Sequence, residues 1–136
     1  MKGSCLCGAI KYEVDRISGV VVSCHCSMCR KATGAAFRTR AAVSADAFRW
    51  LAGEALVSRY ESSPGEIRTF CRVCGSTLPT FFRDRPGELG LPLGTLDDDP
   101  GVRPSAHVFV ASKAPWFEIT DDLPQFAAAM PPAGAG

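Results

Sequence analysis

The sequence predicts a mainly β protein in which small antiparallel sheets surround two zinc sites and a short helix lies near the C-terminus. Three observations predict this class. Short alternating or β-branched runs recur along the chain, Gly and Pro turn signals separate them, and seven cysteines fall in three groups at metal-ligand spacing. The 136 residues suit one domain, which we expect over residues 1–130, followed by a disordered tail over residues 131–136.

The strands are expected where apolar and polar side chains alternate or where β-branched residues cluster. These runs cover residues 9–14, 19–23, 37–39, 55–61, 67–70, 77–82, 88–93 and 105–111. Turn residues at 62–65 and 85–87 predict two hairpins. A single helical turn is expected over residues 44–48, and the short C-terminal helix over residues 123–129.

Charge and hydropathy exclude two classes of partner. The 15 Lys and Arg residues nearly balance the 14 Asp and Glu residues, so the dense basic face that a nucleic acid or a membrane surface requires is not expected. No run approaches the ~18 apolar residues of a membrane span. The N-terminal residues lack the apolar stretch of an export signal, so we expect a cytoplasmic protein.

The cysteines predict metal binding rather than a disulfide framework, because their number is odd and no export signal precedes them. One pair has the Cys-x-x-Cys spacing of a chelating turn, and the other, a Cys-x-Cys pair, is expected to point both sulfurs to one face of an extended strand. Each pair is followed by a glycine that relieves the backbone. A third group packs three cysteines into six residues. The groups are Cys5 with Cys7, Cys24 with Cys26 and Cys29, and Cys71 with Cys74.

Seven cysteines divide naturally into four and three. The central group can hold one metal, and the two outer pairs can meet across the fold as a closed four-thiolate site. Three alternatives stay open: His25 could complete a four-ligand site with the central cysteines, the chain could hold two purely structural zinc ions, or it could hold one zinc ion with spare thiols. Strand alternation points the His25 side chain away from its neighbours and so disfavours the first alternative.

Six segments together resemble the glutathione-dependent formaldehyde-activating enzyme family, the centromere-protein-V-like group with the Mss4-like fold. The three cysteine motifs, within residues 3–8, 24–34 and 70–76, match the metal-binding motifs of this family in order. Residues 94–98, 104–109 and 114–118 extend the similarity, which covers roughly residues 3–126.

The resemblance implies a β-rich tent of sheets with two zinc ions per chain. Carried over motif by motif, it implies a structural zinc on Cys5, Cys7, Cys71 and Cys74 and a catalytic zinc on Cys24, Cys26 and Cys29. It also implies carbon–sulfur lyase chemistry: the condensation of glutathione with formaldehyde to S-hydroxymethylglutathione, or the reverse. The partners are then a small thiol and an aldehyde.

A three-thiolate zinc with an open position could hold a substrate thiol ionised. Arginine and lysine suit the two carboxylates of glutathione, and Arg30 and Lys31 directly follow the central cysteines, so we expect them to contact these groups. His25, fixed between two ligands, is a candidate for moving a proton.

Other polar residues are expected to have structural roles. His107 is at least as well explained as a satisfied structural histidine, and Asp97–Asp99 precede Pro and Gly, as in a turn with backbone-bonded carboxylates. Arg38 and Arg40 are expected on a solvated strand face.

A second hypothesis is a non-enzymatic zinc-binding module for a protein or small-molecule ligand, because fold alone does not choose between binding and catalysis. The three-cysteine group favours the enzyme, since a purely structural site would recruit a fourth protein ligand. A zinc-ribbon that binds nucleic acid is disfavoured by the near-neutral charge.

Overall fold

Ten short strands carry most of the regular structure of residues 1–131, the part of the chain that the computed structural model describes. The strands are β1 (Lys2–Ser4), β2 (Lys11–Val14), β3 (Val21–Cys24), β4 (Arg38–Ser44), β5 (Phe48–Ala52), β6 (Val57–Ser63), β7 (Glu66–Cys71), β8 (Thr77–Phe82), β9 (Glu88–Pro92) and β10 (Ala106–Val108). The prediction of a mainly β protein is confirmed; β1 and β5 were not predicted.

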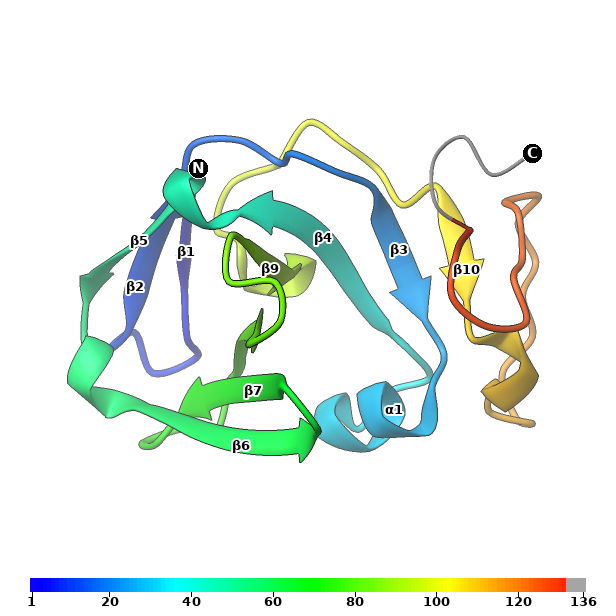
Figure 1. The fold of residues 1–136 in the computed structure, drawn as a ribbon, viewed down its shortest axis with the longest axis horizontal. Coiled ribbons are helices and arrows are strands. Elements are labelled where there is room, and N and C mark those ends of the chain that lie inside the picture. The colour runs from blue at the N-terminus through cyan, green and yellow to red at the C-terminus, as the bar shows by residue number, and fades with distance from the viewer. Residues whose placement is uncertain (132–136) are drawn as a thin grey trace.

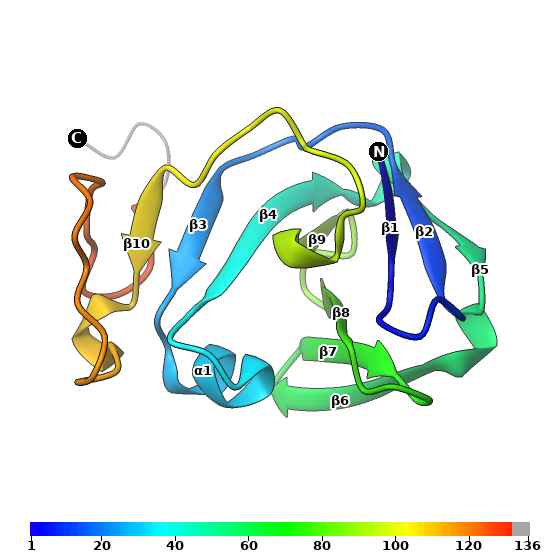
Figure 2. The same ribbon diagram turned by 180° about the vertical axis from the view of Figure 1, so that it is seen from behind.

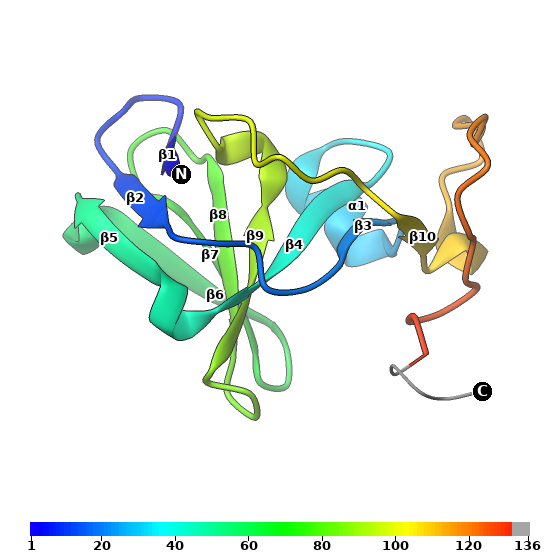
Figure 3. The same cartoon turned by 90° about the horizontal axis from the view of Figure 1, so that it is seen from above.

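The strands form two sheets. A three-stranded sheet has the order β1-β2-β5, and a seven-stranded sheet has the order β10-β3-β4-β9-β8-β7-β6. Every strand pair is antiparallel except β10 with β3. Figures 1 and 2 show the small sheet at one end of the molecule and β10, with the C-terminal segment, at the other. Seen from above, β8 and β9 lie between these ends (Figure 3).

Both predicted hairpins are present. β6 pairs with β7 around the turn at residues 64–65, and β8 pairs with β9 around residues 83–87. The helical turn expected over residues 44–48 is a 3-10 turn at Ala45–Ala47, and further 3-10 turns cover Glu54–Leu56, Leu93–Thr95 and Val110–Ser112. Turn chemistry was therefore a reliable guide to where these strands end.

The α-helix lies near residue 27 and not at the C-terminus. Helix α1 (Ser27–Thr33) begins after Cys26, whose Sγ accepts a hydrogen bond from the backbone N–H of Cys29 at 3.2 Å. It ends at Gly34, which takes the left-handed conformation (φ 66°) and donates its N–H to the Arg30 carbonyl. These two caps satisfy backbone groups that a seven-residue helix would otherwise leave unpaired.

The helix predicted over residues 123–129 is wrong, because this segment pairs with β10 instead. The His107 N–H donates to the Pro124 carbonyl and the Phe126 N–H to the His107 carbonyl, both at 2.9 Å. A helix of this length gains little from its own hydrogen bonds. The free edge of β10 instead offers hydrogen-bond partners to the backbone of residues 124–126.

Three groups of buried apolar side chains fill the interior. The largest joins the two sheets and includes Tyr12, Val43 and Leu91. The second packs Ile10 and Leu78 around Cys5 and Cys71, and the third lies at β3 and β10 beside Cys24 and Cys29. Each of the two smaller groups therefore includes cysteine side chains as part of its core.

Within residues 1–131 the longest α-helix has seven residues, and no helix is long and apolar enough to cross a membrane. The disordered tail expected over residues 131–136 falls, apart from Pro131, outside the described residues. The domain boundary at residue 130 stays a prediction.

Gly53 is a position where only glycine fits. Its φ is +75°, and a Cβ there would overlap the Ala9 carbonyl oxygen. We predict that Gly53→Ala lowers the free energy of unfolding by more than about 2 kcal/mol, because strain and a backbone clash add. Denaturant unfolding measures the change. Gly87→Ala is the matched control, since a Cβ there meets nothing within 4 Å, and an equal loss in both variants would contradict the explanation.

Candidate metal centres

Two groups of cysteine sulfurs lie close enough to hold a metal ion each. The first contains Cys5, Cys7, Cys71 and Cys74, and the second contains Cys24, Cys26 and Cys29. Within each group all sulfur atoms lie within 4.8 Å of one another. Cysteines that are 64 residues apart in the chain thus meet in the four-thiol group, with the Cys7 and Cys71 sulfurs 3.9 Å apart.

Two similar turns position the four-thiol group. In one, the Gly8 N–H donates to the Cys5 carbonyl at 3.0 Å, and in the other the Gly75 N–H donates to the Cys71 carbonyl at 2.8 Å. Both glycines have a positive φ, near +79°. A backbone N–H also approaches a sulfur in each turn, from Ile10 to Cys5 and from Cys74 to Cys71. Such N–H groups stabilise thiolates, so the backbone is arranged for deprotonated sulfur.

The three-thiol group lies where β3 meets α1. Cys24 is the last residue of β3, Cys26 caps the helix, and Cys29 lies on its first turn. Cys24 and Cys29 are buried, whereas Cys26 is partly exposed. The Cys26 sulfur therefore caps the helix and belongs to the three-thiol group at the same time, so the cap also fixes where this thiol lies.

The donor sets fit a metal ion. All seven cysteines are free thiols, and the Cys5 and Cys7 sulfurs are 3.5 Å apart. Thiolates around a tetrahedral zinc ion lie roughly 3.8 Å apart, given a bond of about 2.3 Å. The sulfur spacing is thus that of ligands around a shared ion, far longer than the ~2.05 Å of a disulfide bond.

The thiols shift one another's pKa values in opposite directions. Hydrogen bonds from Cys24 and Cys29 hold the pKa of the Cys26 thiol well below its usual value, while contacts with Cys26 and Cys29 raise the pKa of Cys24. In the four-thiol group, hydrogen bonds from Ser76 lower the pKa of Cys74 to about 5. The pKa of Cys5 is lowered as well, so some thiols in each group ionise readily, and complete ionisation needs a cation to offset the repulsion between thiolates.

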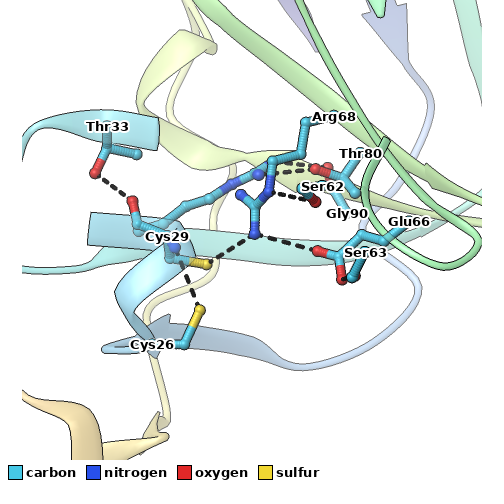
Figure 4. A network of polar contacts seen from close by, with 10 residues as sticks. Cys26, Cys29, Thr33, Ser62, Ser63, Glu66, Arg68, Thr80 and Gly90 are labelled. Atoms are coloured by element: carbon cyan, nitrogen blue, oxygen red, sulfur yellow. Dashed lines mark hydrogen bonds and ion pairs between the residues drawn. The ribbon is translucent and has the colours of Figure 1, made fainter. Parts of the chain in front are cut away.

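A pocket of about 260 Å³ opens beside the three-thiol group and includes all three cysteines in its lining. Arginines from β4 and β7 face them across the pocket: Arg38, Arg40 and Arg68. Figure 4 shows the Arg68 guanidinium between the Cys29 sulfur, at 3.6 Å, and the Glu66 carboxylate, at 3.2 Å. The three-thiol group therefore lies at the edge of a positively charged hollow.

His25 and His107 form a buried pair on the other side of the cysteine motif. The His25 Nε2 is 2.8 Å from the His107 Nδ1, and the His107 Nε2 is 2.9 Å from a carboxylate oxygen of Asp121. Phe37 and Phe117 pack against the His25 ring. His107 is hydrogen-bonded at both ring nitrogens, which agrees with its expected structural role. Burial lowers the pKa of His25, which favours the neutral ring.

The predicted binding residues lie on α1. Arg30 is partly buried and Lys31 is exposed, and neither they nor His25 is among the residues that line the pocket. Their contacts with glutathione and the proton-transfer role of His25 stay predictions. The assignments of the four cysteines to a structural zinc and the three to a catalytic zinc stay predictions too, although the structure groups the thiols in this way.

The expectation that Arg38 lies on a solvated face is wrong, because Arg38 is 3% exposed. Its Nη1 donates to the Thr80 hydroxyl at 2.8 Å and its Nη2 to the Gly90 carbonyl at 3.3 Å. The expectation of a turn holds for Asp97–Asp99, whose carboxylates accept hydrogen bonds from Ser4, the Lys2 N–H and the Gly101 N–H.

The sequence reasoning missed three residues near these sites: Glu66, Arg68 and Asp121. Glu66 and Arg68 alternate on β7, directly before the Cys71 motif. This period-two pair of opposite charges in a strand was the one signal that could have indicated a shared face. Asp121 lies 14 residues after His107, and no local pattern connects them.

Comparisons with known proteins show which family has this sequence and this fold. The sequence profile of the family described as "Glutathione-dependent formaldehyde-activating enzyme" matches residues 1–112. A Halomonas elongata protein, provisionally named as such an enzyme, is 33% identical over 129 residues, which cover 88% of this chain and 80% of that protein. The crystal structure of a Rhodobacter sphaeroides protein superimposes with a TM-score of 0.62 at 32% identity, over 76% of this chain and 92% of that one.

The two thiol groups should differ in their importance for folding. We predict that Cys71→Ser lowers the free energy of unfolding by more than about 3 kcal/mol, since Cys71 is fully buried and joins two distant turns. Cys26→Ser should lower it by less than Cys71→Ser does, because serine is itself a good N-cap and the three-thiol group joins only one strand end and one helix.

Urea unfolding in zinc-containing buffer and metal analysis by mass spectrometry measure both effects. Each variant is expected to lose one bound metal per chain. If the two variants unfold equally easily, the distinction between the thiol groups is wrong.

Proposed function

Because the chain belongs to the glutathione-dependent formaldehyde-activating enzyme family, we propose that it is a zinc-dependent carbon–sulfur lyase that acts on adducts of an aldehyde with glutathione or another small thiol. Formation of S-hydroxymethylglutathione from formaldehyde is the reaction that the family name suggests. The two-sheet arrangement fits the Mss4-like tent of sheets expected for this family. We also propose a cytoplasmic location, where glutathione would be available as the thiol.

The pocket beside Cys24, Cys26 and Cys29 is the observation that carries the proposal. A closed structural site needs four protein ligands, whereas a catalytic site keeps one position for a substrate. Only three thiols gather here within the described residues, and the pocket gives a substrate access to them. A zinc ion held by these thiols would keep a bound substrate thiol ionised at neutral pH.

The charge of the site favours thiol chemistry over hydrolysis. Three thiolates outweigh a divalent cation by one negative charge, which weakens its power to activate water. The positive charges of Arg38 and Arg68 face the same space and attract anionic reactants. In the reaction, the thiol releases its proton, the sulfur bonds to the carbonyl carbon, the carbonyl π electrons move to oxygen, and that oxygen takes up one proton, so atoms and charge balance without an oxidant.

Three roles belong to the same proposal. His25 would move the proton, and Arg30 and Lys31 would contact the carboxylates of glutathione. The structural zinc on Cys5, Cys7, Cys71 and Cys74 would hold the first and middle parts of the chain together, as its place between two sequence-distant turns supports.

Exchange NMR with ¹³C-formaldehyde and glutathione tests the activity, because it measures the rate at which the adduct forms and breaks at equilibrium. We predict that the purified protein raises this rate at least tenfold over the spontaneous rate, and that Cys26→Ser abolishes the increase while the protein stays folded. Arg83→Gln is the control, since this side chain is exposed, pairs with Glu61 and does not line the pocket.

A spontaneous rate in the presence of zinc-loaded protein would contradict the enzyme assignment. If zinc is bound at both sites and glutathione still has no effect on either, the alternative of a non-enzymatic zinc-binding module is favoured.

A further inference from the structure

Two buried arginines face the pocket beside the three-thiol group. Arg38 is 3% exposed and Arg68 is 8% exposed, and both line the pocket together with Cys26 and Cys29. Burying a guanidinium is costly unless an anion compensates its charge, so the partners of these two side chains indicate whether the pocket has room for an anion.

Arg38 has only uncharged partners among the residues described. Its two terminal nitrogens donate to the Thr80 hydroxyl and the Gly90 carbonyl, and its buried Nε has no hydrogen-bond acceptor. No ion pair joins it to a carboxylate within residues 1–131. Burial lowers the pKa of Arg38 to about 10, so the side chain is still charged at neutral pH. A buried cation that no carboxylate pairs with directly is a candidate for binding an anion from solution.

Arg68 links the thiol group to the pocket. Its Nε donates to Ser62, and its Nη2 contacts both Glu66 and the Cys29 sulfur (Figure 4). Its buried Nη1 has no acceptor in the described part of the chain. An anion that accepted from this nitrogen would lie a few ångströms from Cys29, because one guanidinium carries both N–H groups.

The charged groups of the pocket lining, together with a metal-bound three-thiolate group, sum to one positive charge. Three arginines line the pocket, and the Arg40 side chain has no hydrogen-bonded partner among residues 1–131. Glu66 supplies the single carboxylate of the lining. Three thiolates with a divalent metal contribute one further negative charge. One monovalent oxyanion would complete the balance, and the planar N–H pattern of arginine matches a carboxylate.

We propose that this pocket binds a carboxylate of the substrate directly beside the three-thiol group, so that the natural substrate is a short thiol or aldehyde whose carboxylate lies one or two carbons from the reacting atom. The contact of Arg68 with Cys29 sets this short distance. The inference rests on the proposed carbon–sulfur chemistry for the reaction, but the carboxylate site stands on the arginines alone.

Calorimetric titration of the zinc-loaded protein with two matched thiols tests the thiol as the source of the carboxylate. Mercaptoacetate carries a carboxylate where 2-mercaptoethanol, of similar size, carries a hydroxyl group. We predict that mercaptoacetate binds at least tenfold more tightly, and that Arg38→Gln removes this difference without weakening 2-mercaptoethanol. Arg83→Gln, at an exposed arginine in the loop between β8 and β9 that does not line the pocket, should leave both affinities unchanged.

Thermal unfolding and zinc content check that Arg38→Gln is folded. If Arg38→Gln does not fold, Arg40→Gln and Arg68→Lys take its place. Arg40→Gln removes the charge of a partly buried arginine that lines the pocket. Arg68→Lys keeps the charge but loses the planar donor pattern of the guanidinium. Each should lose most of the preference for mercaptoacetate. Equal affinities of the wild-type protein for the two thiols would exclude the thiol as the carboxylate carrier.

The aldehyde is the other source, tested with glyoxylate and formaldehyde as acceptors and 2-mercaptoethanol as the thiol. Exchange NMR of the adducts should then show an Arg38-dependent rate increase for glyoxylate only. If neither the thiol pair nor the aldehyde pair shows an Arg38-dependent preference, or if none of the probes binds, the carboxylate site is overturned.

The outcomes separate this inference from the enzyme assignment. Carboxylate-dependent binding without any rate increase would retain the site and reject the enzyme. Catalysis of the glutathione–formaldehyde reaction, with no preference for carboxylates that depends on Arg38, would retain the enzyme and reject the site.

Discussion

The clustering of seven thiols at two points is the constraint on which the rest of the structure depends. Sulfur atoms this close repel one another once ionised, and as neutral thiols they gain little from being neighbours. A shared cation turns the repulsion into binding, which is how thiolate sites contribute to folding in small domains. The buried cysteines Cys5 and Cys71 are also core side chains, so metal binding and hydrophobic packing act on the same atoms.

The two groups use this constraint differently. Turns from opposite ends of a long stretch of chain form the four-thiol group, and the Leu6 N–H adds a hydrogen bond to Ser76 across them. The three-thiol group is local to one strand end and one helix, so we expect the sheets to persist without it. Its neighbours are buried arginines from β4 and β7, a pocket, and a buried pair of histidines.

Local sequence patterns predicted the features that local physics determines. The spacing of the cysteines indicated the groups, and the turn residues at 62–65 and 85–87 indicated the hairpins, because both depend on neighbouring residues. The helix Ser27–Thr33 was missed because cysteine at position 26 replaces the usual capping residues, and its role as a cap is visible only in the structure. The C-terminal helix was wrong because β10 offered backbone partners from elsewhere in the chain. Arg38 is buried by Thr80 and Gly90, 42 and 52 residues away, and its immediate neighbours carry no trace of that contact.

The arrangement of cysteine ligands around two metal ions determines both the stability and the proposed chemistry of this protein. Crystallography of the zinc-loaded protein, with anomalous data at the zinc edge, measures it most directly. We predict one ion bound by Cys5, Cys7, Cys71 and Cys74, and a second bound by Cys24, Cys26 and Cys29 with its fourth position open to the pocket that Arg38 and Arg68 line. A fourth protein ligand at the second ion, or thiols at that position that bind no metal, would contradict the account.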